Sequence, residues 1–358
     1  MTDQKIAMVG TPCEILAVSK MQEYLDIPVE VKIGLFCMEN FSYSYLSEFL
    51  KNRNINIESI KKFRIEKGFV TAFLDADKKI KIPLDEVQSC IRKNCQICDE
   101  LTSETSDISV GSIGSQSGWS TIIVRTEKGQ KIIDNLIENK QITTKDLTQT
   151  QMKILTNVAN SKNKKNLGNV DQREEIARPV LYRRDIKDTQ FEEEISKSQF
   201  KDLKDNVIDI GACVLCGGCE YVCPENKIKI DGRKPEKKGK CPEFCHTCYI
   251  ACPRMYIPEK LRTQKGKPLG QYKKILTAKA NETNLNGQDG SIVTTILNNL
   301  LESEIVNQAL VVDEDELLPW KPVSKLTNDP KEVIKSSGTK YAACPIFKPL
   351  KALKDEGE

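Results

Sequence analysis

Two dense runs of cysteine constrain the fold of this 358-residue chain more than any other feature. They hold eight of its fourteen cysteines, reading CVLCGGCEYVCP from Cys213 and CPEFCHTCYIACP from Cys241. The residues around them are mostly glycine, proline and charged residues, which cannot form an apolar core. A segment of this kind has to take its fold from what its cysteines bind.

The first run has the spacing C-x2-C-x2-C-x3-C-P, which wraps three thiolates around three irons of a four-iron cluster. Gly217 and Gly218 allow the tight loop. In two-cluster ferredoxins the fourth cysteine, before proline, binds the other cluster. We therefore predict a bacterial-ferredoxin-like α+β module with two 4Fe-4S clusters over residues 207–258. One predicted ligand set is Cys213, Cys216, Cys219 and Cys252, and the other is Cys241, Cys245, Cys248 and Cys223.

The second run departs from this spacing by one extra residue between Cys241 and Cys245. Structural zinc sites are the alternative, but zinc favours separated C-x2-C pairs over three crowded thiols and a C-P ending. We interpret His246, the single histidine, as a solvated loop residue. With one histidine the chain lacks the residues that zinc hydrolases and histidine-dependent triads require.

Charge and hydropathy exclude other classes. There are 54 basic and 51 acidic side chains, and a net charge of +3 does not indicate a nucleic-acid partner. No apolar stretch approaches the ~20 residues of a membrane span, and no secretory signal is visible at the start. We expect a soluble cytoplasmic protein, where reducing conditions favour metal-bound thiols over disulfides.

The first part of the chain, to about Glu138, alternates strand-like and helix-like segments. The predicted strands are Ile6–Val9 and Val31–Phe36, and the predicted helices are Tyr43–Leu50 and Gln130–Glu138. This alternation predicts an α/β domain over residues 1–140.

The segment 141–206 is polar and charged, with few periodic apolar positions. We interpret it as a linker with helical pieces and a solvated surface. Apolar periodicity returns in residues 259–358, with a helix at Ser291–Ser303, a strand at Ala309–Val312 and a helix at Phe347–Asp355.

Five further cysteines lie before residue 100: Cys13, Cys37, Cys90, Cys95 and Cys98. Four would suffice for a third cluster. Cys13 and Cys37 each follow a predicted strand, and strand ends converge at the carboxyl edge of an open sheet. Cys95 and Cys98 form a short chelating hairpin. The alternative is a set of buried structural thiols, and Cys344 is interpreted as an ordinary thiol.

Several segments together resemble the family of beta subunits of coenzyme F420-reducing hydrogenase and its dehydrogenase relatives. They are GTPCE from Gly10, IGLFC from Ile33, IPL from Ile82, the stretch from Asp107 to Ser120, QDGSIVT from Gln288, and SGTKY from Ser337. The added eight-cysteine module makes the chain most similar to the electron-input subunit of F420H2 dehydrogenase.

The order of these segments differs from that of the family, in which the cysteine-rich module and QDG precede GTPC. The chain therefore resembles a circular permutant opened at a polar surface turn; a mis-split gene or a tandem fusion is the alternative. We expect residues 259–358 to pack on 1–140 as one α/β flavin-binding domain made from both chain ends. Met1 and Glu358 should then lie near each other.

The resemblance implies a coenzyme F420-dependent oxidoreductase that passes electrons between reduced F420, FAD and iron-sulfur clusters to a redox partner protein in a complex. A hydride carries two electrons and a cluster accepts one, so a flavin must stand between them, and no protein acid or base is needed. The complex could be peripheral on a membrane. The implied cofactors are FAD and three 4Fe-4S clusters, the third bound by Cys13, Cys37, Cys95 and Cys98.

For the flavin we expect two glycine-containing loops, in which backbone N–H groups and a helix N-terminus approach the pyrophosphate. The expected residues are Gly114, Ser115, Gly118, Trp119, Gln288, Asp289, Gly290, Ser291 and Thr294. Ordinary turns and a core tryptophan are the alternatives. Two rival functions stay open: a non-enzymatic polyferredoxin-like carrier, and an electron donor to sulfite reductase, formate dehydrogenase or glutamate synthase.

Overall fold

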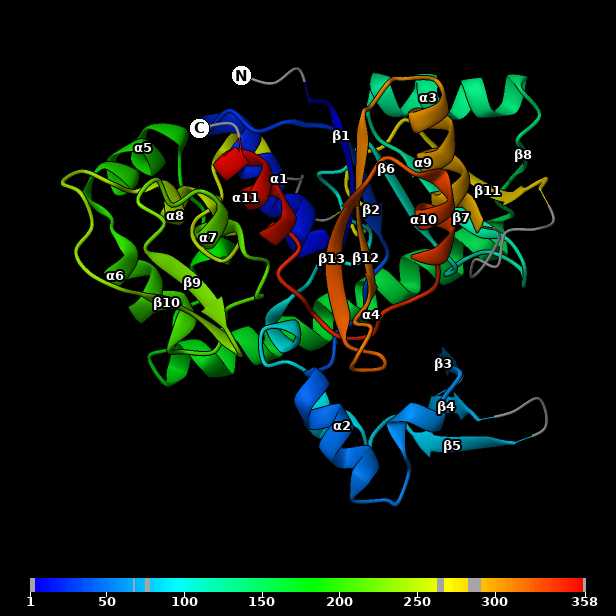
Figure 1. Ribbon diagram of the computed structural model, residues 1–358, viewed down its shortest axis with the longest axis horizontal. Helices are drawn as coiled ribbons and strands as arrows, with labels where there is room; N and C mark the ends of the chain where they lie inside the picture. The colour runs from blue at the N-terminus through cyan, green and yellow to red at the C-terminus, as the bar shows by residue number, and fades with distance from the viewer. Residues whose placement is uncertain (1–3, 67, 75–77, 263–266, 283–290, 357–358) are drawn as a thin grey trace.

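A central eight-stranded sheet organises the computed structural model (Figure 1), which describes residues 4–66, 68–74, 78–262, 267–282 and 291–356. The strand order is β13-β12-β1-β2-β6-β7-β11-β8. The strands are β1 (Ile6–Gly10), β2 (Val29–Leu35), β6 (Ile108–Gly111), β7 (Ser120–Val124), β8 (Ile142–Asp146), β11 (Lys274–Ala280), β12 (Gln308–Glu314) and β13 (Pro322–Thr327).

The four central strands β12, β1, β2 and β6 are parallel, and the outer strands pair antiparallel. Parallel strands need apolar residues on both faces. In β1, Ile6, Ala7 and Met8 are all fully buried. Met8 is opposite Leu310 of β12, so the first and last parts of the chain meet in the middle of the sheet.

Helices cover both faces of this sheet. One face packs against α3 (Glu127–Glu138), α9 (Ile292–Glu302) and α10 (Pro330–Lys335). The other packs against α1 (Pro12–Tyr24), α4 (Gln149–Glu175) and α11 (Lys348–Glu356). No helix in the described part of the chain is long and apolar enough to cross a membrane.

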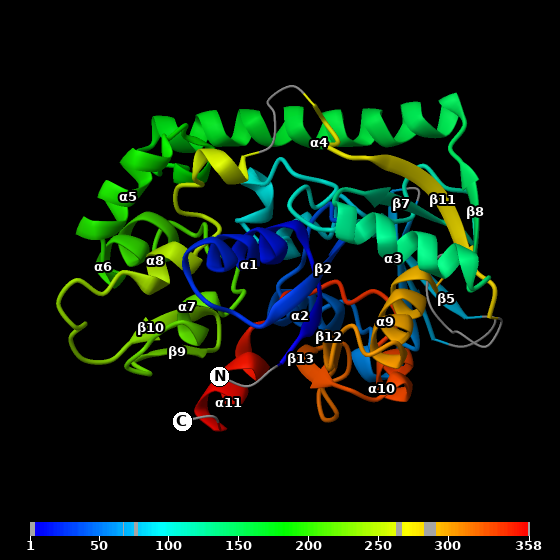
Figure 2. The same cartoon turned by 90° about the horizontal axis from the view of Figure 1, so that it is seen from above.

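Both chain ends contribute to one core, as predicted. Ile6 and Met8 of β1 share an apolar cluster with Phe347 and Leu350 next to and within α11. Figures 1 and 2 show α11 near the start of β1. The prediction for Met1 and Glu358 themselves concerns residues outside those described.

A small lobe lies apart from the sheet in Figure 1. It holds α2 (Tyr43–Lys51) and an antiparallel sheet of β3 (Lys62–Glu66), β4 (Phe69–Phe73) and β5 (Lys79–Pro83). The lobe has its own apolar core. Trp320 ties it to the sheet domain by donating its indole N–H to the Ile60 carbonyl at 2.9 Å.

The cysteine-rich module has the mixed helix and strand content that its α+β prediction requires. Two short helices, α7 (Gly218–Tyr221) and α8 (Thr247–Ala251), each carry cysteines of one run. Between them β9 (Ile228–Asp231) and β10 (Lys234–Lys237) form an antiparallel hairpin. In Figure 1 the module lies beside the sheet domain, at one end of the molecule.

The interpretation of 141–206 as a solvated linker needs correction. Helices are present, namely α4, α5 (Asp188–Lys197) and α6 (Phe200–Leu203), but the segment also supplies β8 to the sheet. Phe191 and Leu203 are buried against the cysteine-rich module. The segment looks polar in sequence because the buried face of α4 includes Lys162 and Asn166, which hydrophobicity does not mark as interior.

Candidate iron-sulfur centres

Four cysteines converge on one cavity at the carboxyl edge of the sheet. Cys13 stands in the first turn of α1 directly after β1, and Cys37 follows β2. Cys95 opens a 3-10 turn (Cys95–Ile97) that ends at Cys98. All four line a cavity of about 410 Å³, counted with its opening to solvent. Cys90 lies instead in the buried core of the small lobe.

The four cysteines of this cavity are half-buried, and most of their thiols resist ionisation on their own. Burial raises the pKa of Cys13 to about 12, and it also raises the pKa of Cys37 and of Cys95. For Cys98 the cationic side chains of Lys162 and Arg254 outweigh burial and lower the pKa. Buried thiolates need positive charge nearby, which iron supplies when it is bound.

Two buried cations stand in the wall of the cavity. The Lys162 ammonium donates to the carbonyls of Cys37 and Glu100, each at 2.6 Å. Arg254, 3% exposed, stacks over the Tyr182 ring with 4.4 Å between the guanidinium carbon and the ring centroid. A cluster with four thiolate ligands carries net negative charge, so these cations complement it.

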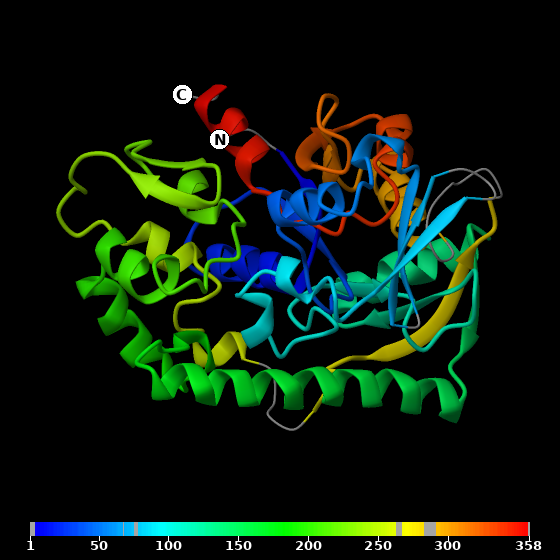
Figure 3. The same ribbon diagram turned by 90° about the horizontal axis from the view of Figure 1, so that it is seen from below.

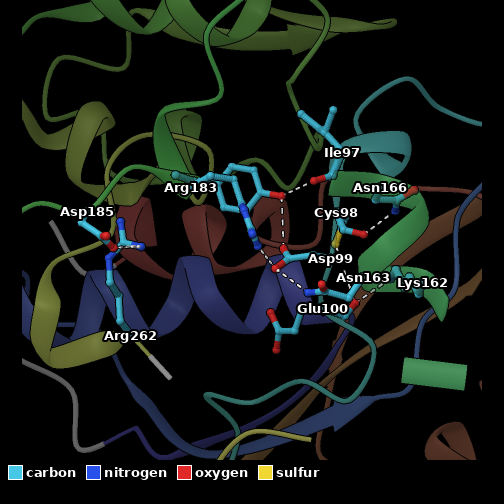
Figure 4. A network of polar contacts seen from close by, with 11 residues as sticks. Ile97, Cys98, Asp99, Glu100, Lys162, Asn163, Asn166, Arg183, Asp185 and Arg262 are labelled. Atoms are coloured by element: carbon cyan, nitrogen blue, oxygen red, sulfur yellow. Dashed lines mark hydrogen bonds and ion pairs between the residues drawn. The ribbon is translucent and has the colours of Figure 1, made fainter. Parts of the chain in front are cut away.

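The hairpin from Cys95 to Asp99 is held by a polar network (Figure 4). Asn166 donates its amide hydrogens to the carbonyls of Cys95 and Cys98, at 3.1 and 2.5 Å. The Tyr182 hydroxyl donates to the Ile97 carbonyl, and Arg183 pairs with Asp99. Ligand-bearing backbone is thus positioned from two sides.

One face of α4 makes most of these contacts. Lys162 and Asn166 are followed by Asn169, which donates to the Gln96 carbonyl at 2.8 Å, and Arg173, which donates to the Ile210 carbonyl at 2.7 Å. The spacing of four, three and four residues keeps them on one side of the helix. Figure 2 shows α4 extending from the β8 edge to the cysteine-rich module. In the sequence, this buried face of the helix is marked by polar residues that repeat about every 3.6 positions. A search for periodic apolar residues does not detect such a pattern.

In the structure, one of the two cysteine sets predicted from the spacing lines a single cavity. This outer cavity has a volume of about 280 Å³, which includes the space open to solvent, and the cysteines that line it are Cys223, Cys241, Cys245 and Cys248. In the other set, burial raises the pKa of Cys213 to about 11 and neighbouring Cys252 adds to the rise. Burial also raises the pKa of Cys219, and four other cysteines add to the rise: Cys213, Cys216, Cys252 and, from the other set, Cys248.

No group of three or more histidine, cysteine, aspartate or glutamate side chains in the described ranges could hold a single metal ion. Thiols spread around a cavity suit a cluster, in which each cysteine binds a different iron. His246 is half-buried at the start of α8 and is not the solvated residue predicted; its Nδ1 atom is buried and has no hydrogen-bond partner in the structure.

Residues of both the cysteine-rich module and the sheet domain line these sites. The Arg92 guanidinium donates to the Cys213 carbonyl at 2.9 Å, and Val214 lines the cavity of Cys13. Fully buried Lys20 donates to the Cys252 carbonyl at 2.7 Å. Arg254, two residues after Cys252, also lines the Cys13 cavity. The two cysteine regions therefore adjoin directly at these contacts.

The first expected flavin loop lies next to Cys37. It follows β6, whose Gly111 is so close to Phe36 that a Cβ there would lie 2.2 Å from the ring. Gly114 and Gly118 have φ of 90° and 78°, which glycine adopts at no steric cost. Ser115 shares hydrogen bonds with the hydroxyls of Thr121 and Thr277 at 2.7 and 3.0 Å.

The other expected flavin residues have mixed outcomes. Trp119 is 8% exposed and lies under the ammonium of Lys145, 4.7 Å from the ring centroid, which fits a packed tryptophan. Gln288, Asp289 and Gly290 lie outside the described residues. Ser291 precedes α9 and Thr294 is buried in its first turns. The chain runs from the C-terminal end of α9 to the start of β12, which is parallel to β1. The N-terminus of α9 therefore lies toward the sheet edge that carries Cys13 and Cys37.

Comparison with known proteins identifies the family of the two parts of the chain that form the sheet domain. Residues 3–150 match the family model for the C terminus of the coenzyme F420 hydrogenase/dehydrogenase beta subunit. Residues 275–351 match the model for the N-terminal part of the same subunit. The chain belongs to this family of F420 hydrogenase/dehydrogenase beta subunits, with the family's C-terminal part first and its N-terminal part last.

Similar proteins come from methanogens. The beta subunit of coenzyme F420 hydrogenase from Methanococcus voltae is 32% identical over 186 residues, 50% of this chain and 66% of that protein. The F subunit of F(420)H(2) dehydrogenase from Methanosarcina mazei is 30% identical over 140 residues, 38% of this chain and 40% of that protein. Coenzyme F420-dependent sulfite reductase of Methanocaldococcus jannaschii is 37% identical over 155 residues, 38% of this chain and 24% of that protein.

Among solved structures, a chain of the F420-reducing [NiFe] hydrogenase complex from Methanosarcina barkeri is 32% identical, with a TM-score of 0.46. The match covers 48% of this chain and 62% of that chain. The present chain thus spans 66% or less of the length of each of these four relatives.

Proposed function

We propose that this protein is an electron-input subunit that takes electrons from reduced coenzyme F420 through FAD and passes them through three iron-sulfur clusters to a partner protein. The observation that carries the proposal is the convergence of Cys13, Cys37, Cys95 and Cys98 on one buried cavity beside the eight-cysteine module. Membership of the family supports the choice of coenzyme F420 and FAD.

In this proposal FAD and the clusters supply the redox chemistry, since the flavin accepts a pair of electrons and releases them singly. The protein supplies position and charge. Cys13, Cys37, Cys95 and Cys98 would hold the cluster next to the flavin, while Lys162 and Arg254 would stabilise its negative charge. The start of α9 and the loop after β6 would hold the flavin phosphates at the same edge.

The proposed order of the redox sites follows from the residues that line neighbouring cavities. The loop at Gly111 packs on Phe36, next to Cys37. The cavity of Cys37 is also lined by Val214 and Arg254, which adjoin the cysteine set containing Cys213 and Cys252. The outer cavity, with Cys223, comes last. This sequence of neighbours supports a route from flavin to the outer cluster. The boundaries of the cysteine-rich module at residues 206 and 258 are part of this proposal, whereas β8 carries the sheet domain past residue 140.

The test is anaerobic purification followed by flavin, iron and sulfide analysis. We expect one FAD and about 12 irons per chain, against about 8 if only the ferredoxin-like module is loaded. Reduced coenzyme F420 should bleach the flavin and then reduce viologen. A protein without FAD, or one whose flavin stays oxidised with reduced F420, would instead be the non-enzymatic carrier.

The partner is a separate question. Similarity to a protein named coenzyme F420-dependent sulfite reductase keeps an electron donor to sulfite reductase among the candidate roles. Formate dehydrogenase and glutamate synthase are the other candidates. Copurification under anaerobic conditions would distinguish these partners.

A further inference from the structure

The hairpin of the cysteine-rich module concentrates the positive charge of the chain. Residues 227–240 contain two acidic side chains and seven basic ones: Lys227, Lys229, Arg233, Lys234, Lys237, Lys238 and Lys240. This local charge of +5 exceeds the +3 of the whole chain, so the rest of the protein is net negative. A basic patch on a chain whose remaining residues are net negative creates a local field that orients an approaching partner.

Two of these basic residues line the outer cysteine cavity, and the other five belong to the same stretch of chain. Lys227 and Lys237 line it together with the four cysteines Cys223, Cys241, Cys245 and Cys248. The Lys237 ammonium lies 3.3 Å from the Cys241 sulfur. Lys234, Lys238 and Lys240 are exposed, whereas the Arg233 guanidinium lies over the Tyr45 ring of α2 and donates to its hydroxyl. The exposed carboxylates nearby include Glu225, which is paired with Lys227 at 3.2 Å.

An exposed aromatic residue stands at the same place. Phe244 is 74% exposed, the most exposed aromatic side chain in the described part of the chain. It lies in the loop between Cys241 and Cys245, where the sequence has one residue more than the ferredoxin spacing. Its φ of 60° lies in the left-handed region, which is unfavourable for a residue with a Cβ. The loop therefore holds the exposed Phe244 in a backbone conformation that this residue type does not prefer. An aromatic anchor inside a charged rim is typical of transient protein interfaces.

The location suits an exit for electrons. The cavity of Cys13 adjoins both the sheet domain and the module, whereas the outer cavity is lined by module residues alone. Figures 2 and 3 show β9 and β10 on the opposite side of the molecule from α4. A partner can therefore approach the outer cavity without contacting the flavin loops or α4.

We propose that this surface, made of Phe244 and the basic side chains of residues 227–240, docks an acidic one-electron carrier protein. The proposal rests on the proposed function, because it assumes a cluster in the outer cavity. In each encounter that cluster loses one electron and the redox centre of the carrier gains it, with no proton or bond transferred. The two electrons of one hydride therefore require two encounters.

The test compares two charge-reversal variants with equal changes in charge. The triple variant K234E/K238E/K240E alters the proposed surface, and K153E/K164E/K165E alters exposed lysines of α4 as a matched control. The donor is reduced coenzyme F420, and the acceptors are a small acidic two-cluster ferredoxin and methyl viologen, followed anaerobically by stopped flow. Phe244→Ala is a third variant that leaves the charge unchanged.

We expect the rate constant for ferredoxin reduction by the wild type to fall steeply with ionic strength. At low salt K234E/K238E/K240E should lower it at least tenfold, with the viologen rate within twofold of the wild type. The control should lower it threefold or less. Phe244→Ala should lower it severalfold without changing the salt dependence.

Equal effects of the two triple variants, or a wild-type rate that does not depend on salt, would overturn the proposal. So would tight binding of duplex DNA at physiological salt that blocks ferredoxin reduction, because the surface would then be a nucleic-acid site. If reduced F420 fails to reduce the flavin, dithionite-reduced protein can be mixed with the oxidised ferredoxin in the same variants. Failure of the proposed function is thereby distinguished from failure of the docking proposal.

Discussion

Replacing Asn166 with leucine should loosen one cluster and leave the other two intact. Asn166 is 5% exposed, and its side chain donates to the carbonyls of Cys95 and Cys98, the two proposed cluster ligands in the hairpin. Leucine has the same branched arrangement of side-chain heavy atoms but cannot donate. Each lost hydrogen bond removes about 1 kcal/mol, and each buried carbonyl left unpaired costs a further ~1 kcal/mol. The hairpin should therefore open about 2–4 kcal/mol more easily.

The assay is the release of iron to a ferrous chelator from anaerobically purified protein. If opening of the hairpin limits release, 2 kcal/mol corresponds to about a 30-fold faster loss. We expect about 4 of the ~12 irons to leave in this fast phase. Asn157→Leu, on the exposed side of the same helix, is the matched control and should release iron as the wild type does.

The reasoning fails if Asn166→Leu and Asn157→Leu release iron at the same rate. It also fails if the fast phase contains about 8 irons, because the change would then have acted on the ferredoxin-like module. Electron paramagnetic resonance before and after the fast phase identifies which cluster signal is lost.

Three further predictions test the same site. Lys162→Gln removes a buried positive charge beside Cys37 and should lower the reduction potential of the adjacent cluster by ~60 mV or more, a tenfold change for one electron. A redox titration followed by electron paramagnetic resonance measures this potential. Lys162→Arg keeps the charge and should remain close to wild type. Cys37→Ala should leave about 8 irons; reduced F420 should still bleach the flavin, but viologen reduction should be slow. Gly111→Ala forces a Cβ into Phe36; it should lower the free energy of unfolding by about 1–3 kcal/mol in denaturant titrations and reduce the amount of bound flavin. Gly168→Ala is the control, because Gly168 in α4 has open space around it. That substitution should be neutral or stabilising.

Local sequence patterns determined much of this protein. The spacing of the eight cysteines predicts the crossed grouping that the structure shows around the outer cavity. The apolar runs locate β1, β2 and β12, because central parallel strands need continuous apolar residues. The segments around Gly10 and Ser337 identify the family and its permuted order. In each case the information lies in neighbouring residues, where spacing and side-chain type are enough.

Tertiary structure alone decided what α4 does. The segment is polar, and although Ala159 and Val170 lie on the same face of α4, a lysine and an asparagine between them are not expected to be buried. They are interior because the carbonyls of Cys37, Cys95 and Cys98, from distant parts of the chain, need donors once the cysteines gather at the sheet edge. A buried carbonyl must be paired, and only the folded chain shows which carbonyls are buried and which helix can reach them.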